Sequence, residues 1–446
     1  MRRLLVFLLL SLPALAQNTQ RMDEIVRSYT DTHKFMGSVL VAKDDHVIFQ
    51  KSYGYANLEW QTPNVDDGKY RLGSITKQFT AVCILLLEEQ GKLSTSDPVN
   101  KYYAEAPASW DKITLRNLLT HTSGIHSFTS LPKYSELEPL PTTPEKELAL
   151  IRDLPLDFEP GTKWDYSNTN FILLGYIVEK VSGMSFTDFL QQNVLAKLGM
   201  TNSGMDTRDP ILEHRVYGYT PGPKGIQNAG YIDMSVPHGA GAMYSTTGDL
   251  LKWTQGLFGG HLLQPTSLTK MTTPFLNDYA FGLNVMTTKS GHKVIQHGGG
   301  IEGFNTELAY YPDDHLTVVA LANLNGSAVG EIAHDLAAVY FNEKVVLPTE
   351  RKALSVPPST LQQYVGEYAG GMASITLTVT LDGDQLYIQL TGQPKFAALP
   401  FADPESPNSF FFKEVDGELQ FIKDSAGKFT KAVLHQGGRD VEWLRK

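Results

Sequence analysis

Ser74 and Lys77 lie three residues apart, and a hydroxyl beside an amine is a pair of groups that could do nucleophilic chemistry. The pattern Ser-x-x-Lys arises easily by chance, because it occurs six times in the 446 residues. Its serines are Ser74, Ser109, Ser130, Ser267, Ser290 and Ser425. Among them, only Ser74 follows a glycine and opens a long apolar stretch of helical period, which extends to Gln90. Ser74 is therefore the candidate nucleophile.

The spacing has a chemical use if the segment is helical. Side chains three apart on a helix have Cβ atoms about 5–6 Å apart, so the Lys77 amine can reach the Ser74 hydroxyl. A serine hydroxyl is a weak nucleophile until a base removes its proton, and burial can lower the pKa of a lysine enough to make it that base. The pair alone leaves open an alternative, in which Ser74 is a helix N-cap and Lys77 a solvated residue of the first turn.

Two further motifs carry groups that suit the same chemistry. Tyr166 could act as a second base beside a lysine, and the amide of Asn168 could hold both a substrate carbonyl and the lysine. His297 opens a run of three glycines, Gly298, Gly299 and Gly300, whose missing side chains would let a strand approach a substrate closely. Taken singly, an asparagine-capped turn and a glycine-rich turn remain open as alternatives.

Four segments in this order resemble a known family more specifically than any single motif does. They cover residues 70–80 around Ser74, residues 118–125 (Leu-Leu-Thr-His-Thr-Ser-Gly-Ile), residues 158–168 around Tyr166, and residues 241–250. The set resembles the serine β-lactamase and penicillin-binding-protein superfamily, in the class C-like branch that also holds carboxypeptidases, esterases and D-aminopeptidases. The resemblance extends over about residues 22 to 345.

The resemblance implies a fold and a role for each motif. The fold would be α+β, with an antiparallel sheet flanked by helices, an all-helical lobe, and the site in the cleft between them. The implied catalytic residues are Ser74, which is acylated, Lys77, Tyr166 and His297, and the implied substrate-binding residues are Asn168, Gly298, Gly299 and Gly300. Backbone N–H groups of Ser74 and Gly300 would form the oxyanion hole. Neither a metal nor a cofactor is implied, and the choice between Lys77 and Tyr166 as general base stays open.

One departure from the family pattern bears on the substrate. The third motif usually begins with lysine followed by threonine and glycine, whereas here it begins with His297 and Gly298. An unperturbed histidine has a pKa of about 6.5 and is mostly neutral at pH 7, so a substrate carboxylate should be held less firmly. Esters, amides and peptides with N-terminal D-residues become the favoured substrates, with weak β-lactamase activity open. D-aminopeptidase-like members share the histidine form of the motif and also carry C-terminal barrels.

Elements that must position these residues follow from periodicity. We expect strands over residues 38–42, 47–52 and 316–321, a helix over 74–90 that is buried nearly all round, and a helix over 170–180. After a proline-punctuated linker at 346–356, alternating residues 375–381 and the turn Asp382-Gly383 predict antiparallel hairpins. Further hairpin turns are expected at Asp416-Gly417 and Gly437-Gly438. Residues 17–345 would form the hydrolase domain and residues 357–446 a lipocalin-like β-barrel domain, which could cap the site or support oligomerisation.

The N-terminus and the composition restrict the setting. Arg2, Arg3, an apolar run over 4–12 and Ala14-Leu15-Ala16 predict a signal peptide of residues 1–16, cleaved near Ala16, and hence a secreted or periplasmic protein without stable membrane insertion. The net charge of −10 argues against nucleic acid as a partner. The one cysteine, Cys83, allows no disulfide within the chain and is expected in the core.

Two function classes compete. The favoured one is an acyl-enzyme hydrolase acting on a small molecule or peptide. The alternative is a non-catalytic or slowly deacylating penicillin- or peptide-binding protein or sensor, with a ligand-binding barrel.

Overall fold

The computed structural model describes residues 5–347, 350–370, 375–401, 408–413, 417–436 and 439–446. The chain forms two compact units, one of residues 5–22 with 29–329 and one of residues 23–28 with the rest of the chain from Gly330 on. The first helix, α1 (Leu5–Thr30), runs through the expected cleavage point at Ala16. Within the described residues, no helix is both long and apolar enough to cross a membrane.

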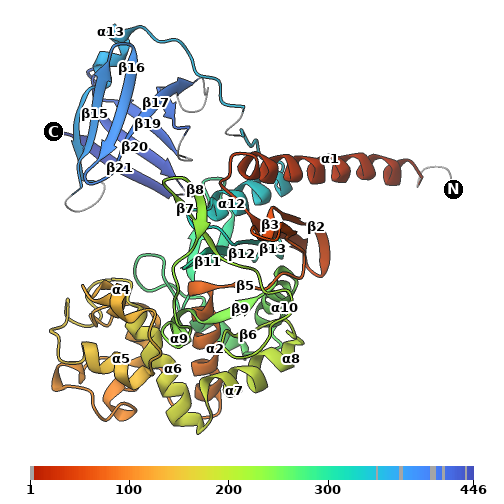
Figure 1. The fold of residues 1–446 in the computed structure, drawn as a ribbon, viewed down its shortest axis with the longest axis vertical. Coiled ribbons are helices and arrows are strands. Elements are labelled where there is room, and N and C mark those ends of the chain that lie inside the picture. The colour runs from red at the N-terminus through yellow and green to blue at the C-terminus, as the bar shows by residue number, and fades with distance from the viewer. Residues whose placement is uncertain (1–4, 348–349, 371–374, 402–407, 414–416, 437–438) are drawn as a thin grey trace. The chain divides into compact units, whose positions relative to one another are not determined.

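A six-stranded antiparallel sheet forms the frame of the first unit (Figure 1). Its order is β10 (Asn284–Thr287), β11 (Lys293–Ile301), β12 (Phe304–Tyr311), β13 (Leu316–Ala322), β1 (Gly37–Lys43) and β2 (His46–Tyr53). Every residue of β13 is buried, as expected for an apolar central strand. The three predicted strands of this domain are confirmed, each to within one residue at either end.

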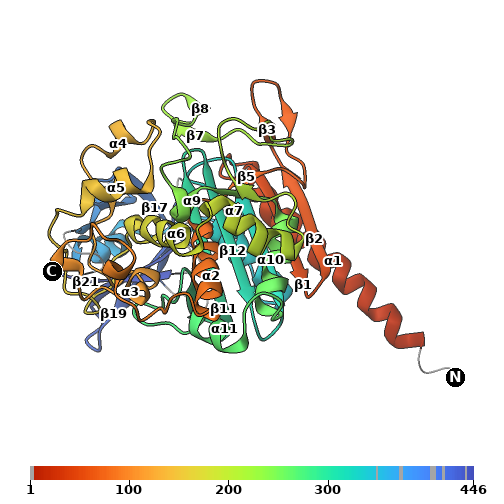
Figure 2. The same ribbon diagram turned by 90° about the horizontal axis from the view of Figure 1, so that it is seen from below.

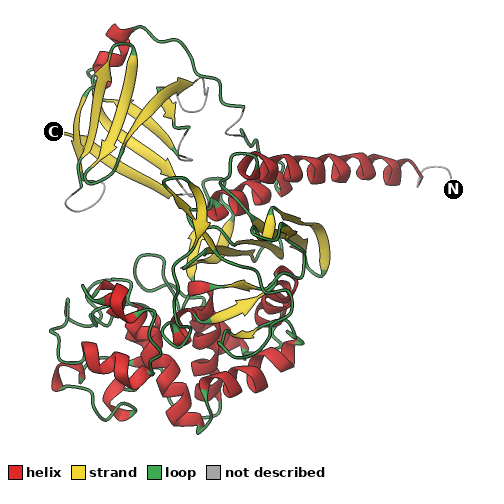
Figure 3. Ribbon diagram, viewed as in Figure 1, coloured by secondary structure: helices red, strands yellow, loops and turns green. Residues whose placement is uncertain are grey.

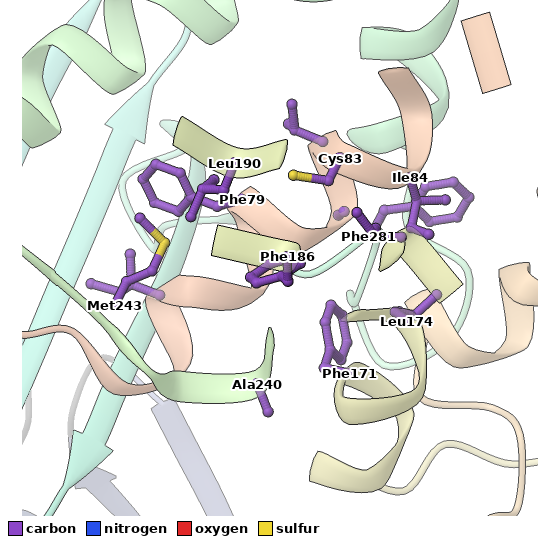
Figure 4. Packing of buried hydrophobic residues seen from close by; sticks show 14 of the residues in the cluster. Phe79, Cys83, Ile84, Phe171, Leu174, Phe186, Leu190, Ala240, Met243 and Phe281 are labelled. Atoms are coloured by element: carbon purple, nitrogen blue, oxygen red, sulfur yellow. The ribbon is translucent and has the colours of Figure 1, made fainter. Parts of the chain in front are cut away.

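Helix α2 (Thr76–Glu89) passes through the middle of this unit (Figure 2). Its first twelve residues are all buried, which confirms the expectation of a helix buried nearly all round. Phe79 stacks on Trp253 with ring centroids 3.8 Å apart. Cys83 is fully buried in the same cluster (Figure 4), and burial raises the pKa of its thiol, so this side chain is a core residue. This packing fixes the helix that follows the candidate nucleophile.

The other helices of this unit pack around α2, and α10 among them also packs against β13 and β1 of the sheet (Figure 3). They are α3 (Leu115–Leu119), α4 (Tyr134–Leu137), α5 (Pro144–Ile151), α6 (Asn168–Ser182), α7 (Phe186–Leu190), α8 (Ala196–Leu198), α9 (His238–Gly241), α10 (Thr247–Phe258) and α11 (Pro265–Met271). Short strands complete the unit: β3 (Tyr55–Asn57), β4 (Thr62–Pro63), β5 (Tyr70–Arg71), β6 (Gly204–Met205), β7 (Tyr219–Gly222), β8 (Gly225–Asn228) and β9 (Met243–Ser245). Helix α6 is longer than the predicted 170–180 and ends at Gly183, whose φ of 73° is the left-handed conformation that glycine favours at a C-cap.

The second unit contains α12 (Val329–Tyr340), α13 (Pro358–Leu361) and a closed eight-stranded antiparallel barrel. Its strands follow chain order: β14 (Gly366–Ala369), β15 (Leu377–Asp382), β16 (Gln385–Leu390), β17 (Lys395–Phe401), β18 (Ser409–Phe411), β19 (Glu418–Lys423), β20 (Phe429–Gln436) and β21 (Arg439–Arg445). The barrel is thus confirmed, as is the hairpin between β15 and β16. Asp416, Gly437 and Gly438 of the other expected turns, and residues 348–349 of the expected linker, lie outside the described residues. Aromatic side chains pack in the core of the barrel, with the Tyr364 and Phe421 rings 4.7 Å apart.

Candidate active site

Ser74 lies in a tight turn, not in the helix that was expected to begin with it. The turn is a 3₁₀ segment, η1 (Gly73–Ile75), between β5 and the start of α2. Gly73 has φ of 54°, and a Cβ added there would lie 2.8 Å from the backbone nitrogen of Gly300. Only glycine fits this conformation and this close approach without strain. The turn presents Ser74 at the N-terminus of α2 and against strand β11.

Lys77 is fully buried, and its amine has three close oxygen neighbours. The Nζ atom lies 3.0 Å from Ser74 Oγ, 2.8 Å from Asn168 Oδ1 and 2.9 Å from the carbonyl oxygen of Ala240. Burial holds the pKa of Lys77 well below its usual value, which favours the neutral amine. Within the described part of the chain, no carboxylate forms an ion pair with this amine.

A neutral amine matches these three neighbours one for one. It has two N–H donors and one lone pair, and the oxygens of Asn168 and Ala240 can only accept hydrogen bonds. The two donors are therefore used on these two oxygens, and the lone pair faces Ser74. The Ser74 hydroxyl can then donate to Lys77, which is the geometry of a nucleophile beside its base.

Tyr166 covers the other side of the lysine. The Lys77 amine lies 4.8 Å from the centre of the Tyr166 ring. Burial raises the pKa of Tyr166, and its hydrogen bond with Ser74 opposes that rise only in part. In a buried site a neutral phenol beside a neutral amine costs less than a pair of ions, because neither group then has to be desolvated as a charge.

Asn168 is the first residue of α6, and its amide is fixed at both ends. Its Oδ1 accepts from Lys77, while its Nδ2 donates to Thr129 Oγ1 at 3.3 Å. The backbone N–H of Asn168 donates to Ser127 Oγ at 3.1 Å. Ser127 and Thr129, which hold this amide in place, were not found from the sequence, because isolated hydroxyl residues in a loop carry no recognisable pattern.

His297 lies on β11 and contacts a residue that sequence reasoning also missed. Its Nε2 lies 2.9 Å from Tyr279 Oη, and its Nδ1 lies 2.6 Å from the carbonyl oxygen of Gly298. The rings of His297 and Tyr166 have centroids 6.3 Å apart. The predicted groups of Ser74, Lys77, Asn168, Tyr166 and His297 are therefore brought together in one site.

The three glycines of β11 have different surroundings. A Cβ on Gly299 would lie 1.9 Å from the carbonyl oxygen of Leu72, so the backbone beside the nucleophile turn leaves no room for a side chain. A Cβ on Gly298 would instead meet Glu307 at 2.9 Å, on the other face of the strand. A Cβ on Gly300 would meet only Asn305 within 4 Å, at 3.4 Å. Strand β10 begins opposite Gln296, so the part of β11 after Gln296 is not paired with it. That part runs beside η1, where the Gly300 N–H suits an oxyanion hole.

His121 is a fully buried histidine at the centre of the site. Its Nδ1 lies 3.3 Å from the Ser167 backbone nitrogen and 3.2 Å from Asn170 Nδ2, and its ring centre lies 4.3 Å from that of Tyr166. Burial, with smaller effects of Lys77 and His297, holds the pKa of His121 well below its usual value. The residue supports Tyr166 as a neutral packing partner. It belongs to residues 118–125, which the family resemblance had singled out without giving His121 a role.

A second Ser-x-x-Lys pair also lies on a helix, α11, and shows why context is needed. There Lys270 Nζ lies 2.8 Å from Glu88 Oε2, so this lysine forms an ion pair with a carboxylate instead of the contacts with neutral oxygens that Lys77 makes.

The chain is also similar to known proteins. Residues 22–342 match the family model described as Beta-lactamase, and residues 350–446 match a domain of unknown function, DUF3471. Penicillin-binding protein 4* of Bacillus subtilis (strain 168) is 27% identical, over 96% of this chain and 99% of that protein.

Two solved structures are also similar to this chain. The octameric penicillin-binding protein homologue from Pyrococcus abyssi is 25% identical with a TM-score of 0.68, and the match covers 96% of this chain and 99% of that one. A D-stereospecific amidohydrolase from Streptomyces sp. is 26% identical with a TM-score of 0.62, over 74% of this chain and 99% of that one.

Proposed function

This chain belongs to the β-lactamase family, and we propose that it is a serine hydrolase that forms an acyl-enzyme on Ser74 and cleaves amide or ester bonds. One observation carries the proposal. The buried Lys77 amine lies 3.0 Å from the Ser74 hydroxyl, and both of its other contacts are oxygens that accept its hydrogens. A lysine so placed has its lone pair free for the serine proton.

The proposed reaction begins with proton transfer from Ser74 Oγ to Lys77 Nζ. The oxygen attacks the substrate carbonyl carbon, and the N–H groups of Ser74 and Gly300 stabilise the oxyanion. The leaving amine or alcohol then takes a proton from the Lys77 ammonium, by way of the Tyr166 phenol, and departs. Water hydrolyses the acyl-enzyme, with Lys77 again as base. The opposite pKa directions of Lys77 and Tyr166 support Lys77 as the base and Tyr166 as a proton donor.

We further propose D-aminoacyl amides and small uncharged esters as the preferred substrates. His297 in place of a lysine leaves the third motif without a permanent cation for a substrate carboxylate. The similarity to a D-stereospecific amidohydrolase supports the amide class. Penicillins, which carry a carboxylate, are proposed as poor substrates.

A panel of substrates tests the function. Purified protein and its Ser74→Ala variant are assayed with nitrophenyl esters, D-aminoacyl and L-aminoacyl nitroanilides, and nitrocefin. We expect turnover of esters or D-aminoacyl amides to exceed that of nitrocefin, and all turnover to disappear with Ser74→Ala. A covalent adduct that forms but does not turn over would instead favour the slowly deacylating sensor. Aromatic side chains pack in the core of the barrel, where the alternative hypothesis would need room for a ligand. This packing favours the hydrolase over a binding protein with a ligand-binding barrel.

Export and assembly are two further proposals. The N-terminal pattern supports removal of residues 1–16 during secretion, and Edman sequencing of secreted protein should begin at Gln17. The octameric homologue from Pyrococcus abyssi, aligned with 96% of this chain, supports oligomerisation, to which the C-terminal barrel could contribute. Light scattering of the full chain, compared with a chain ending before residue 346, tests that contribution.

A further inference from the structure

Tyr279 contacts the third-motif histidine and is held rigidly in place. It lies in the segment between α11 and β10, and its side chain is buried. The backbone N–H of Tyr279 donates to the Leu276 carbonyl at 3.0 Å, and its carbonyl accepts from Phe275 N–H at 2.9 Å. The phenol oxygen lies 2.9 Å from His297 Nε2. A short backbone turn thus directs one hydroxyl at one imidazole nitrogen.

The other nitrogen of His297 determines which tautomer is present. Its Nδ1 lies 2.6 Å from the Gly298 carbonyl oxygen, which can only accept, so Nδ1 must carry the hydrogen. In a neutral ring Nε2 is then the acceptor, and the Tyr279 hydroxyl donates to it. Burial keeps the pKa of Tyr279 well above its usual value, so the phenol keeps the proton that it donates.

We propose that Tyr279 is a specificity-determining positioning residue, which holds His297 as the neutral Nδ1–H tautomer and occupies the Nε2 atom that would otherwise bind a substrate carboxylate. The consequence for substrates rests on the proposed hydrolase function, whereas the state of the imidazole does not. A carboxylate would have to replace the Tyr279 contact and would meet a ring without charge. Uncharged acyl groups meet no such obstacle.

Groups that face the His297 ring from other elements act in the same direction. They are the Tyr166 ring at 6.3 Å and the Tyr279 ring at 5.7 Å between centroids, together with His121, whose pKa is lowered by burial and also by Lys77 and His297. A positive charge on His297 lowers the pKa of His121, and by the same interaction a protonated His121 would disfavour a positive charge on His297.

The first test reads the imidazole directly and does not depend on turnover. Histidine is labelled with ¹⁵N in the full-length protein, the His297 signals are assigned by their loss in His297→Gln, and pH is varied from 5 to 8. We expect wild-type His297 to be neutral at pH 7 with its hydrogen on Nδ1. In Tyr279→Phe, which leaves Nε2 without this donor, protonation should move to higher pH by about one unit. Tyr103→Phe, which removes the hydroxyl of a buried tyrosine whose ring packs with Trp110 and Tyr176, is the control and should leave the His297 protonation unchanged.

The second test measures selectivity. The KM for a substrate with a free carboxylate is compared with the KM for its methyl ester, in wild type and in Tyr279→Phe. In Tyr279→Phe the substrate carboxylate can form a charge-assisted hydrogen bond with His297. The ratio of the KM of the carboxylate substrate to the KM of the methyl ester should therefore be about tenfold lower than in wild type. A purely structural defect would change both equally.

The inference is overturned if wild-type His297 is cationic or carries its hydrogen on Nε2 at pH 7, or if Tyr279→Phe leaves its protonation unchanged. Absence of turnover with either substrate would instead count against the proposed function, while the NMR result would still decide the state of His297.

Discussion

The amine of Lys77 lies 3.0 Å from the hydroxyl of Ser74, and its two other polar contacts are an amide oxygen and a backbone carbonyl. No hydrogen of a neutral amine is left over, so the lone pair is directed at the serine. This relationship links the packing of α2, which excludes water from Lys77, to the reactivity of the neighbouring turn.

Replacing Lys77 by arginine should abolish the base while keeping a long polar side chain. Arginine stays protonated at any pH that a protein tolerates, so acylation should fall by about 10²-fold or more. In wild type, acylation should rise with pH as Lys77 loses its proton, and the midpoint should lie well below the usual lysine pKa. Stopped-flow acylation rates between pH 5 and 10 check both points. A midpoint near 10 in wild type, or an arginine variant as fast as wild type, would contradict the assignment.

Stability should also depend on the charge of Lys77. Its pKa is lower in the folded than in the unfolded protein, so the unfolded chain binds more protons in the interval between the two values. Burial of Lys77 therefore does not lower the free energy of unfolding above the pKa of the unfolded chain. The free energy of unfolding decreases as pH falls from that value toward the pKa of Lys77 in the folded protein. Urea unfolding of wild type and Lys77→Met at pH 6 and pH 9 should show that the methionine variant loses less stability on acidification. Equal losses would contradict the lowered pKa.

Gly299 and Gly300 form a matched pair for testing the close approach of β11 to the nucleophile turn. Gly299→Ala would place a Cβ 1.9 Å from the Leu72 carbonyl oxygen, which forces the strand to shift. We expect the free energy of unfolding to decrease by about 1–3 kcal/mol or more and the activity to fall sharply. Gly300→Ala meets only the Asn305 amide at 3.4 Å and should fold normally. Thermal unfolding measures both, and equal melting temperatures for the two variants would argue against this arrangement.

Replacing Asn168 should lower kcat more than replacing Thr129, whose hydroxyl orients the Asn168 amide. Asn168→Leu removes the oxygen that accepts a hydrogen from Lys77, and kcat should fall by about 10²-fold. Thr129→Val removes only the 3.3 Å contact to Asn168 Nδ2, and a loss of about threefold to tenfold is expected. Steady-state kinetics on one ester substrate gives the comparison. The order of the two effects is the prediction, and the reverse order would contradict it.

Glu147 on α5 should make stability fall at alkaline pH. Its side chain is buried, Oε2 has no hydrogen-bond partner among the described residues, and burial raises the pKa of this carboxyl to about 9. Because the folded pKa exceeds the unfolded one, stability is complete below pH 4.5 and is lost as pH rises toward 9. The free energy of unfolding of Glu147→Gln, relative to that of wild type, should therefore be about 1–3 kcal/mol higher at pH 8 than at pH 4. Denaturant unfolding at the two pH values measures the gain, and a constant difference would refute it.

Much of the site could be predicted from the sequence, because three short motifs carry both the reactive groups and their local spacing. Alternation along a strand also predicts that Gly298 faces away from His297 and Gly299. Tyr279 could not be found, because it lies in an irregular segment and meets His297 only through the folding of β10 and β11. The exact start of α2 was also missed, since a 3₁₀ turn at Ser74 keeps the helical period of the apolar residues.

The most direct measurement of the central claim is the mass spectrometric mapping of a serine-directed phosphonate adduct. Full-length protein is labelled at pH 8, digested and sequenced, beside the variants Ser74→Ala and Ser267→Ala. The account predicts one adduct, on the peptide that contains Ser74, retained in Ser267→Ala and lost in Ser74→Ala. Labelling that persists in Ser74→Ala, or that maps to another serine, would contradict it.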